Sequence, residues 1–423
     1  MELQNARGTR DFLPKEKLVR NEVQNTLVRV FELYGFSPFE TPVLERYDIL
    51  SSKYAGGAEI LKESFRLKDQ GGRELGLRYD LTVPLSRFVG MNPQLKMPAK
   101  LYQIGNVFRD GPISASRYRQ FMQCDVDIIG AKGMLAETEL LSLANEAFQR
   151  LGIAVAIKLN SRKLLNELLD WSDIRKEQHE TVILSIDKIE KFGLKEVEKE
   201  LHDKGIARDK IQKVMEFVSI SGFSDERIEK IGQLLKKSPG LKEIEELMKY
   251  LSLLGIEVAF DQSLARGLAY YTGTVFEITA RDSPVKSAIC AGGRYDEMIS
   301  SLLGRGEYPA VGISFGLDRI YDVVCETKKP HRKVVSKVYI IPIKTADVCL
   351  KILELLRKEG IHADMDLSDR GPSKNLDYAN SLNIPYVLII GKKELEKEKM
   401  TLRDMKTGQE EMLRIDEVVK KLK

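Results

Sequence analysis

Charged, aromatic and amide side chains alternate along residues 117–127. If this segment is a β-strand, its side-chain period of two puts six of them on one face, namely Arg117, Arg119, Phe121, Gln123, Asp125 and Asp127. The face then runs from cations through an aromatic ring to an amide and carboxylates. That order suits phosphates, a stacked base and an amino-bearing substrate laid along one strand. A solvent-exposed face with one stray phenylalanine would give the same pattern, so other segments must decide.

Two further arginines stand where they could bind phosphate. Arg109 precedes a loop, and its guanidinium could bind a phosphate through two parallel hydrogen bonds. Arg319 follows Gly316, where we expect a strand to break into a helix whose first-turn N–H groups attract anions. Both are also ordinary surface positions for arginine.

Glycines flank chemically useful side chains in two other segments. Tyr270 and Tyr271 are adjacent, so they point to opposite sides if the chain is extended, and only one of them needs to line a pocket. Gly292 and Gly293 follow an expected strand, where they would permit either a close ligand approach or a tight turn.

Several kinds of chemistry are not expected. No phosphate-binding loop of the G-x-x-x-x-G-K-[S/T] type and no G-x-G-x-x-G turn occurs in the sequence. Four separated cysteines without a Cys-x-x-Cys pair indicate reduced thiols in or near the core rather than a disulfide framework or a zinc site. A histidine general base or histidine-ligated metal is not expected either, because the segments above contain none of the four histidines, which are His179, His202, His331 and His362.

The elements that must position these residues follow from the hydrophobic pattern. Residues 15–34 and 136–151 have helical periodicity, and each run is followed by a glycine. Residues 101–109 and 117–130 form a predicted β-hairpin with an enlarged loop. Later strand-like runs, at 257–260, 274–280, 287–291 and 309–315, are too closely spaced for helical crossovers, so this sheet should be largely antiparallel.

Length and composition set the broad class. A chain of 423 residues should form two or three domains. No apolar run approaches the ~20 residues that span a bilayer, and the first residues lack a secretory pattern, so we expect a cytoplasmic protein. The net charge of +4 is only weak support for a polyanionic partner.

Three segments resemble the motifs of class II aminoacyl-tRNA synthetases. Residues 108–121 look like motif 2, and residues 316–319 after a strand look like motif 3. Residues 39–42 are similar to motif 1, whose proline packs at a dimer interface, so the resemblance implies a homodimer with Pro42 at its interface.

Two longer segments resemble one family within this class. Residues 265–273 (Ala-Arg-Gly-Leu-Ala-Tyr-Tyr-Thr-Gly) and 291–296 (Ala-Gly-Gly-Arg-Tyr-Asp) resemble the two signature blocks of histidyl-tRNA synthetases, and residues 6–14 and 77–84 also fit. The resemblance covers nearly the whole chain. It implies an α+β catalytic domain with a mainly antiparallel sheet, a helical insertion, and a C-terminal α/β domain of the anticodon-binding type.

The expected division has five parts: a catalytic core with motifs 1 and 2 at 1–172, a helical insertion at 173–254, a catalytic core with the signature blocks and motif 3 at 255–325, a linker at 326–337, and an anticodon-binding domain at 338–423.

The resemblance also implies a reaction and its partners. ATP would activate L-histidine to histidyl-adenylate with release of pyrophosphate, and histidine would then pass to the 3′ end of histidine tRNA. Mg²⁺ is expected to come with ATP rather than in a protein cage, and no metal ligand is predicted. The imidazole offers one donor and one acceptor, so paired polar contacts would reject apolar amino acids without an editing site.

Site residues are carried over by position from the same resemblance. Arg109 and Arg266 are the implied catalytic residues, near the α-phosphate and the substrate carboxylate. The implied ATP-binding set is Arg109, Arg117, Phe121 and Arg319, with Phe121 stacked on adenine. The implied histidine-binding set is Asp80, Leu81, Thr82, Arg109, Gln123, Asp127, Arg266, Tyr270, Tyr271 and Tyr295.

Two positions depart from the family pattern. Position 269 is alanine where the signature block usually has aspartate, so any interaction of that aspartate is missing. Gly111 stands where motif 2 usually carries an acidic residue that meets adenine, which puts that contact in doubt.

The C-terminal domain and the rival functions complete the expectations. Arg370 and Lys374, beside Gly371, are possible contacts to an anticodon, although surface charge is the alternative. A non-catalytic, histidine-binding regulatory subunit of ATP phosphoribosyltransferase shares the synthetase core, but typically lacks the signature arginines and the anticodon domain. A class II synthetase for another amino acid, such as proline or threonine, would lack the two histidyl blocks.

Overall fold

The computed structural model describes residues 2–52, 61–114, 117–267, 269–327 and 334–423. The chain divides into two compact units, one of residues 1–11 and 23–328 and the other of residues 12–22 and 329–423. Half of the linker expected at 326–337, residues 328–333, lies outside the described residues. Among the described residues, no helix is both long and apolar enough to cross a membrane.

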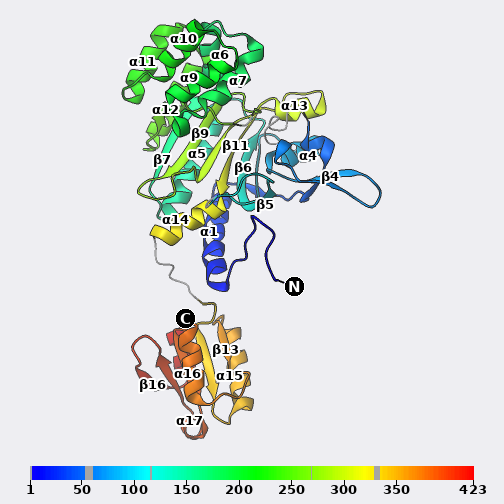
Figure 1. The fold of residues 1–423 in the computed structure, drawn as a ribbon. Coiled ribbons are helices and arrows are strands. Elements are labelled where there is room, and N and C mark those ends of the chain that lie inside the picture. The colour runs from blue at the N-terminus through cyan, green and yellow to red at the C-terminus, as the bar shows by residue number, and fades with distance from the viewer. Residues whose placement is uncertain (1, 53–60, 115–116, 268, 328–333) are drawn as a thin grey trace. The chain divides into compact units, whose positions relative to one another are not determined.

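An eight-stranded sheet organises the larger unit (Figure 1), with the order β1-β5-β6-β11-β10-β9-β7-β8. All pairs inside the sheet are antiparallel, and only the edge pairs β1–β5 and β7–β8 are parallel. The prediction of a mainly antiparallel sheet is therefore confirmed. The strands are β1 (Ser37–Pro38), β5 (Ala99–Phe108), β6 (Gln120–Ile129), β7 (Val155–Ser161), β8 (Ala259–Phe260), β9 (Thr274–Ala280), β10 (Cys290–Arg294) and β11 (Ala310–Gly316).

Helices cover one face of this sheet. Phe31 of α1 (Pro14–Leu33) and Phe148 of α5 (Leu135–Leu151) both contact Phe315 of β11, with ring centroids 5.4 and 5.6 Å apart. Their apolar stripes are buried, as the helical periodicity predicts. Gly152 ends α5 in the left-handed conformation at φ 61°, which a glycine adopts without steric cost. Because strand side chains alternate, Ser314 beside Phe315 faces the opposite side of the sheet.

A smaller sheet and short helices stand beside the hairpin β5–β6. The sheet has the order β2-β4-β3. These elements are β2 (Leu44–Arg46), α2 (Tyr47–Leu50), β3 (Arg66–Lys68), β4 (Glu74–Leu77) and α4 (Thr82–Met91), and α4 contacts α13 (Met298–Leu303). Helix α4 is absent from the sequence prediction, because Pro84 and β-branched residues at its start suggest an extended chain. Proline is tolerated there because first-turn N–H groups have no helical partner.

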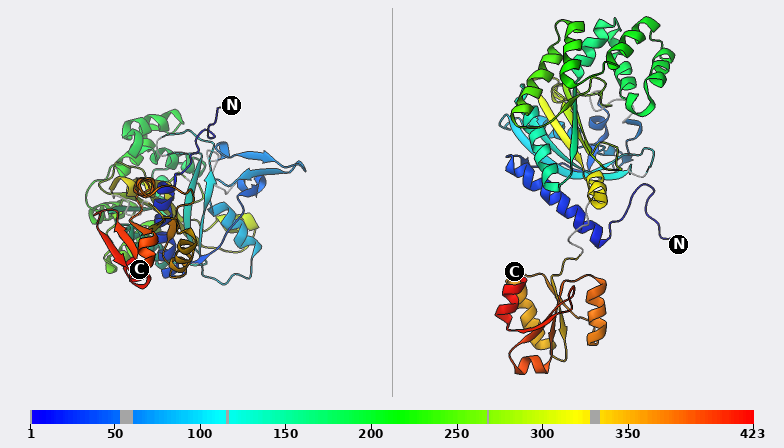
Figure 2. Two further views of the ribbon diagram at one scale, coloured as in Figure 1. Left: turned by 90° about the horizontal axis from the view of Figure 1, so that it is seen from below. Right: turned by 90° about the vertical axis from the view of Figure 1, so that its left-hand side faces the viewer.

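Residues 173–254 are helical, as predicted. Figures 1 and 2 show helices α7 to α12 gathered at one end of the sheet. Helix α12 packs against α5, α6 and β7, which attaches the group to the core. Helix α6 (Arg162–Trp171) precedes this range, which contains α7 (Lys176–Ile186), α8 (Ile189–Phe192), α9 (Leu194–Asp203), α10 (Arg208–Val218), α11 (Ser224–Leu235) and α12 (Pro239–Leu253). We call residues 173–254 the helical segment.

The smaller unit contains a five-stranded sheet with the order β13-β12-β14-β15-β16. Helices and strands alternate from β12 to β14, as expected for the predicted α/β domain, and the antiparallel hairpin β15–β16 extends the sheet. Apolar residues of β12, β14, α15 and α18 form its core. The elements are β12 (Val338–Pro342), α15 (Ala346–Lys358), β13 (Ala363–Met365), α16 (Pro372–Ser381), β14 (Tyr386–Ile390), α17 (Lys392–Glu396), β15 (Met400–Asp404), β16 (Glu410–Leu413) and α18 (Ile415–Leu422).

A buried ion pair joins α5 to the sheet. Arg294, at the end of β10, donates two hydrogen bonds to Glu137 of α5, from Nε to Oε1 at 2.6 Å and from Nη2 to Oε2 at 2.7 Å. Both side chains are almost fully buried, and Thr274 Oγ1 donates a third hydrogen bond to Glu137. Such a pair is not a large net source of stability, but removing one partner leaves a buried charge uncompensated.

We therefore expect Glu137→Ala to lower the free energy of unfolding by about 3–5 kcal/mol, because Arg294 would lose its buried bidentate partner and keep only the partly exposed Asp296. Chemical denaturation monitored by circular dichroism measures this change. The matched control is Glu139→Ala on the same helix, which removes a partly exposed pair with Lys100 and should cost about 1 kcal/mol or less. Equal losses for the two variants would contradict the interpretation.

Candidate active site

The face of the large sheet opposite α1 and α5 carries a cavity of about 470 Å³. Strands β6, β10 and β11 form its floor, and parts of its wall come from Asp80, Thr82, Arg266, Gly267, Tyr270 and Tyr271. Most of the predicted site residues line it, namely Asp80, Thr82, Arg109, Arg117, Phe121, Gln123, Asp127, Arg266, Tyr270, Tyr271, Tyr295 and Arg319. Residues from five distant stretches of the sequence thus meet in one pocket.

The alternating face of β6 is largely as predicted. Phe121, Gln123, Asp125 and Asp127 all line the cavity. Arg119 is a correction: β6 begins only at Gln120, so the period of two does not extend back to this residue. Its guanidinium pairs instead with Asp110 at 2.9 Å, and its backbone N–H donates to the carbonyl of Gly8. Arg117 also precedes the strand but reaches the cavity from the loop.

Buried carboxyl groups define one end of the pocket. Asp80, Asp125 and Asp127 are each no more than 5% exposed. Burial raises the pKa of Asp80 to about 6 and that of Asp127 to about 7. Burial, with the nearby charge of Asp127, also raises the pKa of Asp125. These carboxyl groups should therefore ionise more readily when a cationic group of a ligand enters the pocket.

Neutral donors hold these carboxyl groups in place. Tyr295 donates its hydroxyl hydrogen to Asp127 Oδ1 at 2.5 Å, and Ser314 donates to Asp125 Oδ1 at 2.5 Å. Gln123 in turn donates to Ser314 Oγ at 2.7 Å. Asp80 Oδ1 accepts from the backbone N–H of Val83, but Asp80 Oδ2 is buried without a hydrogen-bond partner among the described residues. That oxygen is an acceptor available to a ligand.

Three tyrosines form the wall at this end. The rings of Tyr270 and Tyr271 have centroids 4.8 Å apart, and those of Tyr270 and Tyr295 are 6.0 Å apart. Both tyrosines of the adjacent pair line this pocket, although an extended chain would need only one of them to do so.

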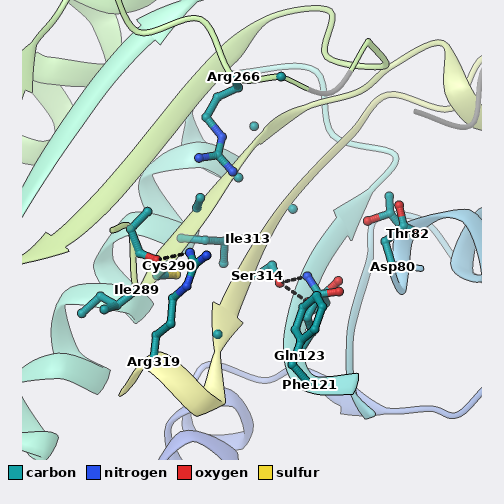
Figure 3. A pocket seen from close by; sticks show the side chains of 18 of the residues that line it. Asp80, Thr82, Phe121, Gln123, Arg266, Ile289, Cys290, Ile313, Ser314 and Arg319 are labelled. Carbon is teal, nitrogen blue, oxygen red and sulfur yellow. Dashed lines mark hydrogen bonds between the residues drawn. The ribbon is translucent and has the colours of Figure 1, made fainter. Parts of the chain in front are cut away.

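Guanidinium groups occupy the opposite side of the pocket. Figure 3 shows Arg266 and Arg319 extending toward one another, with Asp80 and Thr82 across the cavity. Arg319 donates from Nη1 to the carbonyl of Ala288 at 2.7 Å. Burial lowers the pKa of Arg319, and the nearby charges of Arg266 and Arg109 lower it further. Like charges gathered in a partly buried site favour binding of an anion.

Arg109 and Phe121 meet where the two ends of the pocket join. Arg109 donates from Nε to the carbonyl of Tyr79 at 3.0 Å, which fixes its direction. Its Cζ atom lies 5.2 Å from the ring centroid of Phe121. An aromatic face beside a guanidinium suits a base joined to a phosphate.

Strand β10 brings the sheet close to its neighbour. Gly292 and Gly293 lie within β10 rather than after it, which corrects the sequence interpretation of a turn. A Cβ atom on Gly292 would stand 2.1 Å from the carbonyl oxygen of Gly312, so no larger residue fits. Arg294 of the same signature block points into the core, where it pairs with Glu137. The block thus shapes the floor of the pocket.

Some predicted residues lie elsewhere. Leu81 is 1% exposed and does not line the cavity. Its side chain is part of the hydrophobic core, whereas its neighbours Asp80 and Thr82 line the cavity. Pro42 is exposed and stands away from the cavity. In the smaller unit, Arg370 stacks on Tyr378 at 4.2 Å, and Lys374 is exposed on α16.

The sequence interpretation missed Glu63 and Ser314. Ser314 could have been found from the alternation in β11, because it lies two residues after Gly312 on the same face. Glu63 had no comparable signal. Its carboxylate pairs with Arg117 and occupies the space that a side chain on Gly111 would enter, 2.6 Å from the Cβ position. A carboxylate therefore stands beside the motif 2 loop although position 111 has none.

Comparisons with known proteins agree with this geometry. A model of the family described as histidyl-tRNA synthetase matches residues 8–320, and a model described as anticodon binding domain matches residues 337–423. The chain is 44% identical over 420 residues to histidine–tRNA ligase 1 of Bacillus cereus (strain ZK / E33L), covering 97% of each. The crystal structure of histidyl-tRNA synthetase from Nostoc sp. PCC 7120 superposes with a TM-score of 0.86 at 30% identity, covering 100% of this chain and 99% of that one.

The sheet, the pocket and the separate C-terminal unit together define a class II aminoacyl-tRNA synthetase, which is an aminoacyl-tRNA ligase. Within that class, the chain belongs to the histidyl-tRNA synthetase family.

A structure from Bacillus halodurans C, described as an ATP phosphoribosyltransferase regulatory subunit/histidyl-tRNA synthetase, shares the fold. Its TM-score is 0.75 at 22% identity, covering 90% of this chain and 97% of that one. At this identity the likeness concerns the fold alone. The regulatory alternative is not favoured, because the curated relatives at 44% identity are histidine–tRNA ligases over nearly their full length.

The pocket makes a prediction about pH and stability. The pKa of Asp127 rises from 3.8 to about 7 on folding, so the folded state resists its ionisation. Well below pH 4, Asp127 is protonated in both the folded and the unfolded state and does not change the free energy of unfolding. Its destabilising effect grows as the pH rises and reaches its full size above about pH 7. The free energy of unfolding should therefore fall as the pH rises through this range.

Asp127→Asn cannot ionise, so it should be more stable than the wild type at pH 8, by on the order of 1–2 kcal/mol, and similar to it at pH 4.5. Denaturant unfolding of the ligand-free protein at the two pH values measures the difference. Asp203→Asn, exposed at the end of α9, serves as the control. A variant destabilised equally at both pH values would refute the assigned ionisation.

Proposed function

We propose that the chain activates L-histidine with ATP and transfers it to the 3′ end of histidine tRNA, with both small substrates laid along β6. The observation that carries this proposal is the order of side chains in one cavity, with guanidinium groups and Phe121 at one end and buried carboxyl groups at the other. ATP is anionic with a flat base, while histidine carries an ammonium group and an imidazole. The pocket is complementary to the two molecules placed end to end.

The cationic end would bind ATP. Phe121 offers its face to the adenine ring, and Arg319 and Arg117 would hold the terminal phosphates. Arg117 is paired with Glu63, so this ion pair would have to open for Arg117 to bind a phosphate. Arg109, held by the Tyr79 carbonyl, would contact the α-phosphate where the two substrates meet.

The acidic end would bind histidine. Asp80, with its unpartnered Oδ2, would accept the α-ammonium group together with Thr82 and Gln123. Asp127 and Tyr271 would meet the imidazole, and Tyr270 and Tyr295 would close the pocket. A site built to make paired hydrogen bonds rejects a substrate that cannot supply them. Leu81 stays a predicted contact, and its buried side chain would act only by holding its two neighbours.

The reaction would occur between these two ends. A carboxylate oxygen of histidine attacks the α-phosphorus, the bond to the bridging oxygen breaks, and pyrophosphate leaves. Arg109 and Arg266 would stabilise the charge that develops on the α-phosphoryl oxygens, a role that preorganised donors fill without reorganisation. Mg²⁺ would arrive bound to the phosphates of ATP as part of that substrate. No cluster of three potential ligands is found among the described residues.

Further proposals concern the C-terminal unit, the oligomeric state and the cellular location. The C-terminal unit, described by residues 334–423, would contact the anticodon through Arg370 and Lys374. Exposed apolar side chains next to Pro42, Val43 at 39% and Leu44 at 50%, support a homodimer formed through this segment. The five-part domain division stays a prediction. Because tRNA and ATP are its proposed substrates, we also propose that the protein acts in the cytoplasm.

Amino-acid-dependent ATP–pyrophosphate exchange tests the proposal directly. Measured without tRNA against each of the twenty amino acids, exchange should occur with histidine alone, because only its side chain satisfies the Asp127 and Tyr271 contacts. Exchange with another amino acid, or with none, would contradict the proposal.

The Arg319→Ala variant tests the phosphate end of the pocket in the same assay. Loss of this guanidinium should raise the KM for ATP at least tenfold and leave the KM for histidine within about twofold, because Arg319 lies at the phosphate end. Arg281→Ala removes an exposed arginine on the outside of the same unit and should change neither.

A further inference from the structure

A second cavity, of about 420 Å³, lies next to the candidate active site. One part of its lining comes from the end of α7 and from α8 in the helical segment, including Asp187 and Glu190. The other part comes from the core, including Lys158 and Glu277. Arg266 and Gly267 line both this cavity and the active-site pocket. The chain at Arg266 therefore forms part of the wall between them.

The backbone at Arg266 has an unfavourable conformation. Its φ is +52°, in the left-handed region that residues with a Cβ adopt only when their surroundings hold them there. Asp187 faces this turn: burial raises the pKa of its carboxyl group, and the charge and backbone N–H of Arg266 act in the opposite direction. Oδ2 of Asp187 lies 3.4 Å from the position that a Cβ on Gly267 would take, so the carboxylate restrains the turn by direct contact. The carboxylate thus lies directly against this turn.

The side chain of Arg266 is held from the core. Its Nη1 donates to Oε2 of Glu277 on β9 at 2.7 Å, while its Nε is buried without a hydrogen-bond partner among the described residues. Figure 3 shows the guanidinium directed into the active-site pocket. Asp187 and Glu277 together therefore hold both the backbone and the side chain, and the guanidinium keeps an unused donor.

Asp187 belongs to a different part of the fold from the residue it holds. It is the residue that follows α7, at the C-terminal end of that helix. Nearby, Glu190 of α8 pairs with Lys158 of β7 at 3.1 Å, and Asp261 approaches the same lysine at 3.4 Å. The junction of α7 and α8 is thus attached to the sheet through Lys158 and to the Arg266 turn through Asp187.

We propose that Asp187 is a positioning residue for Arg266, through which the helical segment sets the placement of this guanidinium in the active site. The inference rests on the role proposed above for Arg266. Asp187 lines the second cavity and not the substrate pocket, so it acts on the reaction only through Arg266, whose backbone turn it lies against and whose guanidinium its charge attracts. Its loss should weaken stabilisation of the transition state more than it weakens substrate binding.

The test compares variants in histidine-dependent ATP–pyrophosphate exchange. Asp187→Ala removes the carboxylate that lies against the turn at Arg266 and should lower kcat at least tenfold, with the KM values for ATP and histidine within about twofold of wild type. Asp187→Asn keeps an oxygen at this position and should recover most of the loss, to within three- to fivefold. Glu190→Gln, in the same cavity but on the Lys158 side, is the matched control and should stay within twofold.

A double-mutant cycle separates positioning from a general structural effect. In an Arg266→Lys background, where the guanidinium is absent, either Asp187 substitution should lower kcat by less than twofold further. An equal loss in both backgrounds, or a wild-type kcat for Asp187→Ala, would overturn the inference. If Asp187→Ala does not fold, Asp187→Asn completes the same cycle. Absence of exchange in the wild type would instead refute the proposed function.

Discussion

The pair between Arg294 and Glu137 is the interaction on which the geometry of the pocket depends. It is fully buried, bidentate and reinforced by Thr274, and it joins the helical layer to β10. Because Arg294 is fixed in the core, the next residue, Tyr295, is turned toward β6, where its hydroxyl binds Asp127. The buried ion pair of Arg294 thus determines where Tyr295 meets Asp127 in the site. The pair fixes this arrangement of side chains rather than adding much net stability, since buried ion pairs seldom do so.

The same pocket concentrates opposite charges at its two ends. The charges of Arg109 and Arg266 repel that of Arg319, and burial opposes ionisation of Asp80, Asp125 and Asp127. Both conditions oppose stability and are relieved when an anion and a cation enter together. Sites that bind charge in a preformed arrangement gain affinity and rate because little reorganisation remains to be done. The rigid antiparallel sheet holds these groups apart.

Much of this arrangement follows from the sequence. The alternation in β6 predicted four of its pocket residues, and helical periodicity predicted α1, α5 and the helices of residues 173–254, because both signals come from local geometry. The prediction extended the strand to Arg119, since alternation alone does not show where a strand begins. Helix α4 was missed because proline in a first turn resembles a chain break. The resemblance to a family supplied most of the roles, which composition and spacing could not.

Other features depend on contacts between distant residues. Glu63 lies more than fifty positions from Arg117, and nothing near it in the sequence indicates that the two pair. Arg294 stands in a signature block, where it could be taken for a substrate ligand, yet its partner is in a helix formed much earlier in the chain. Asp187 is similar, because its importance appears only when α7 is seen against the turn at Arg266. Pairings of this kind are set by tertiary packing, which a single sequence does not display.

The central claim is that one row of side chains on β6 orders both substrates, with adenine at Phe121 and imidazole at Asp127. A crystal structure with a non-hydrolysable histidyl-adenylate analogue tests it most directly. The account predicts the adenine ring stacked on Phe121, the imidazole hydrogen-bonded to Asp127 and Tyr271, and the linking group between Arg109 and Arg266. An analogue bound in the reverse direction, or away from the face of β6, would contradict it.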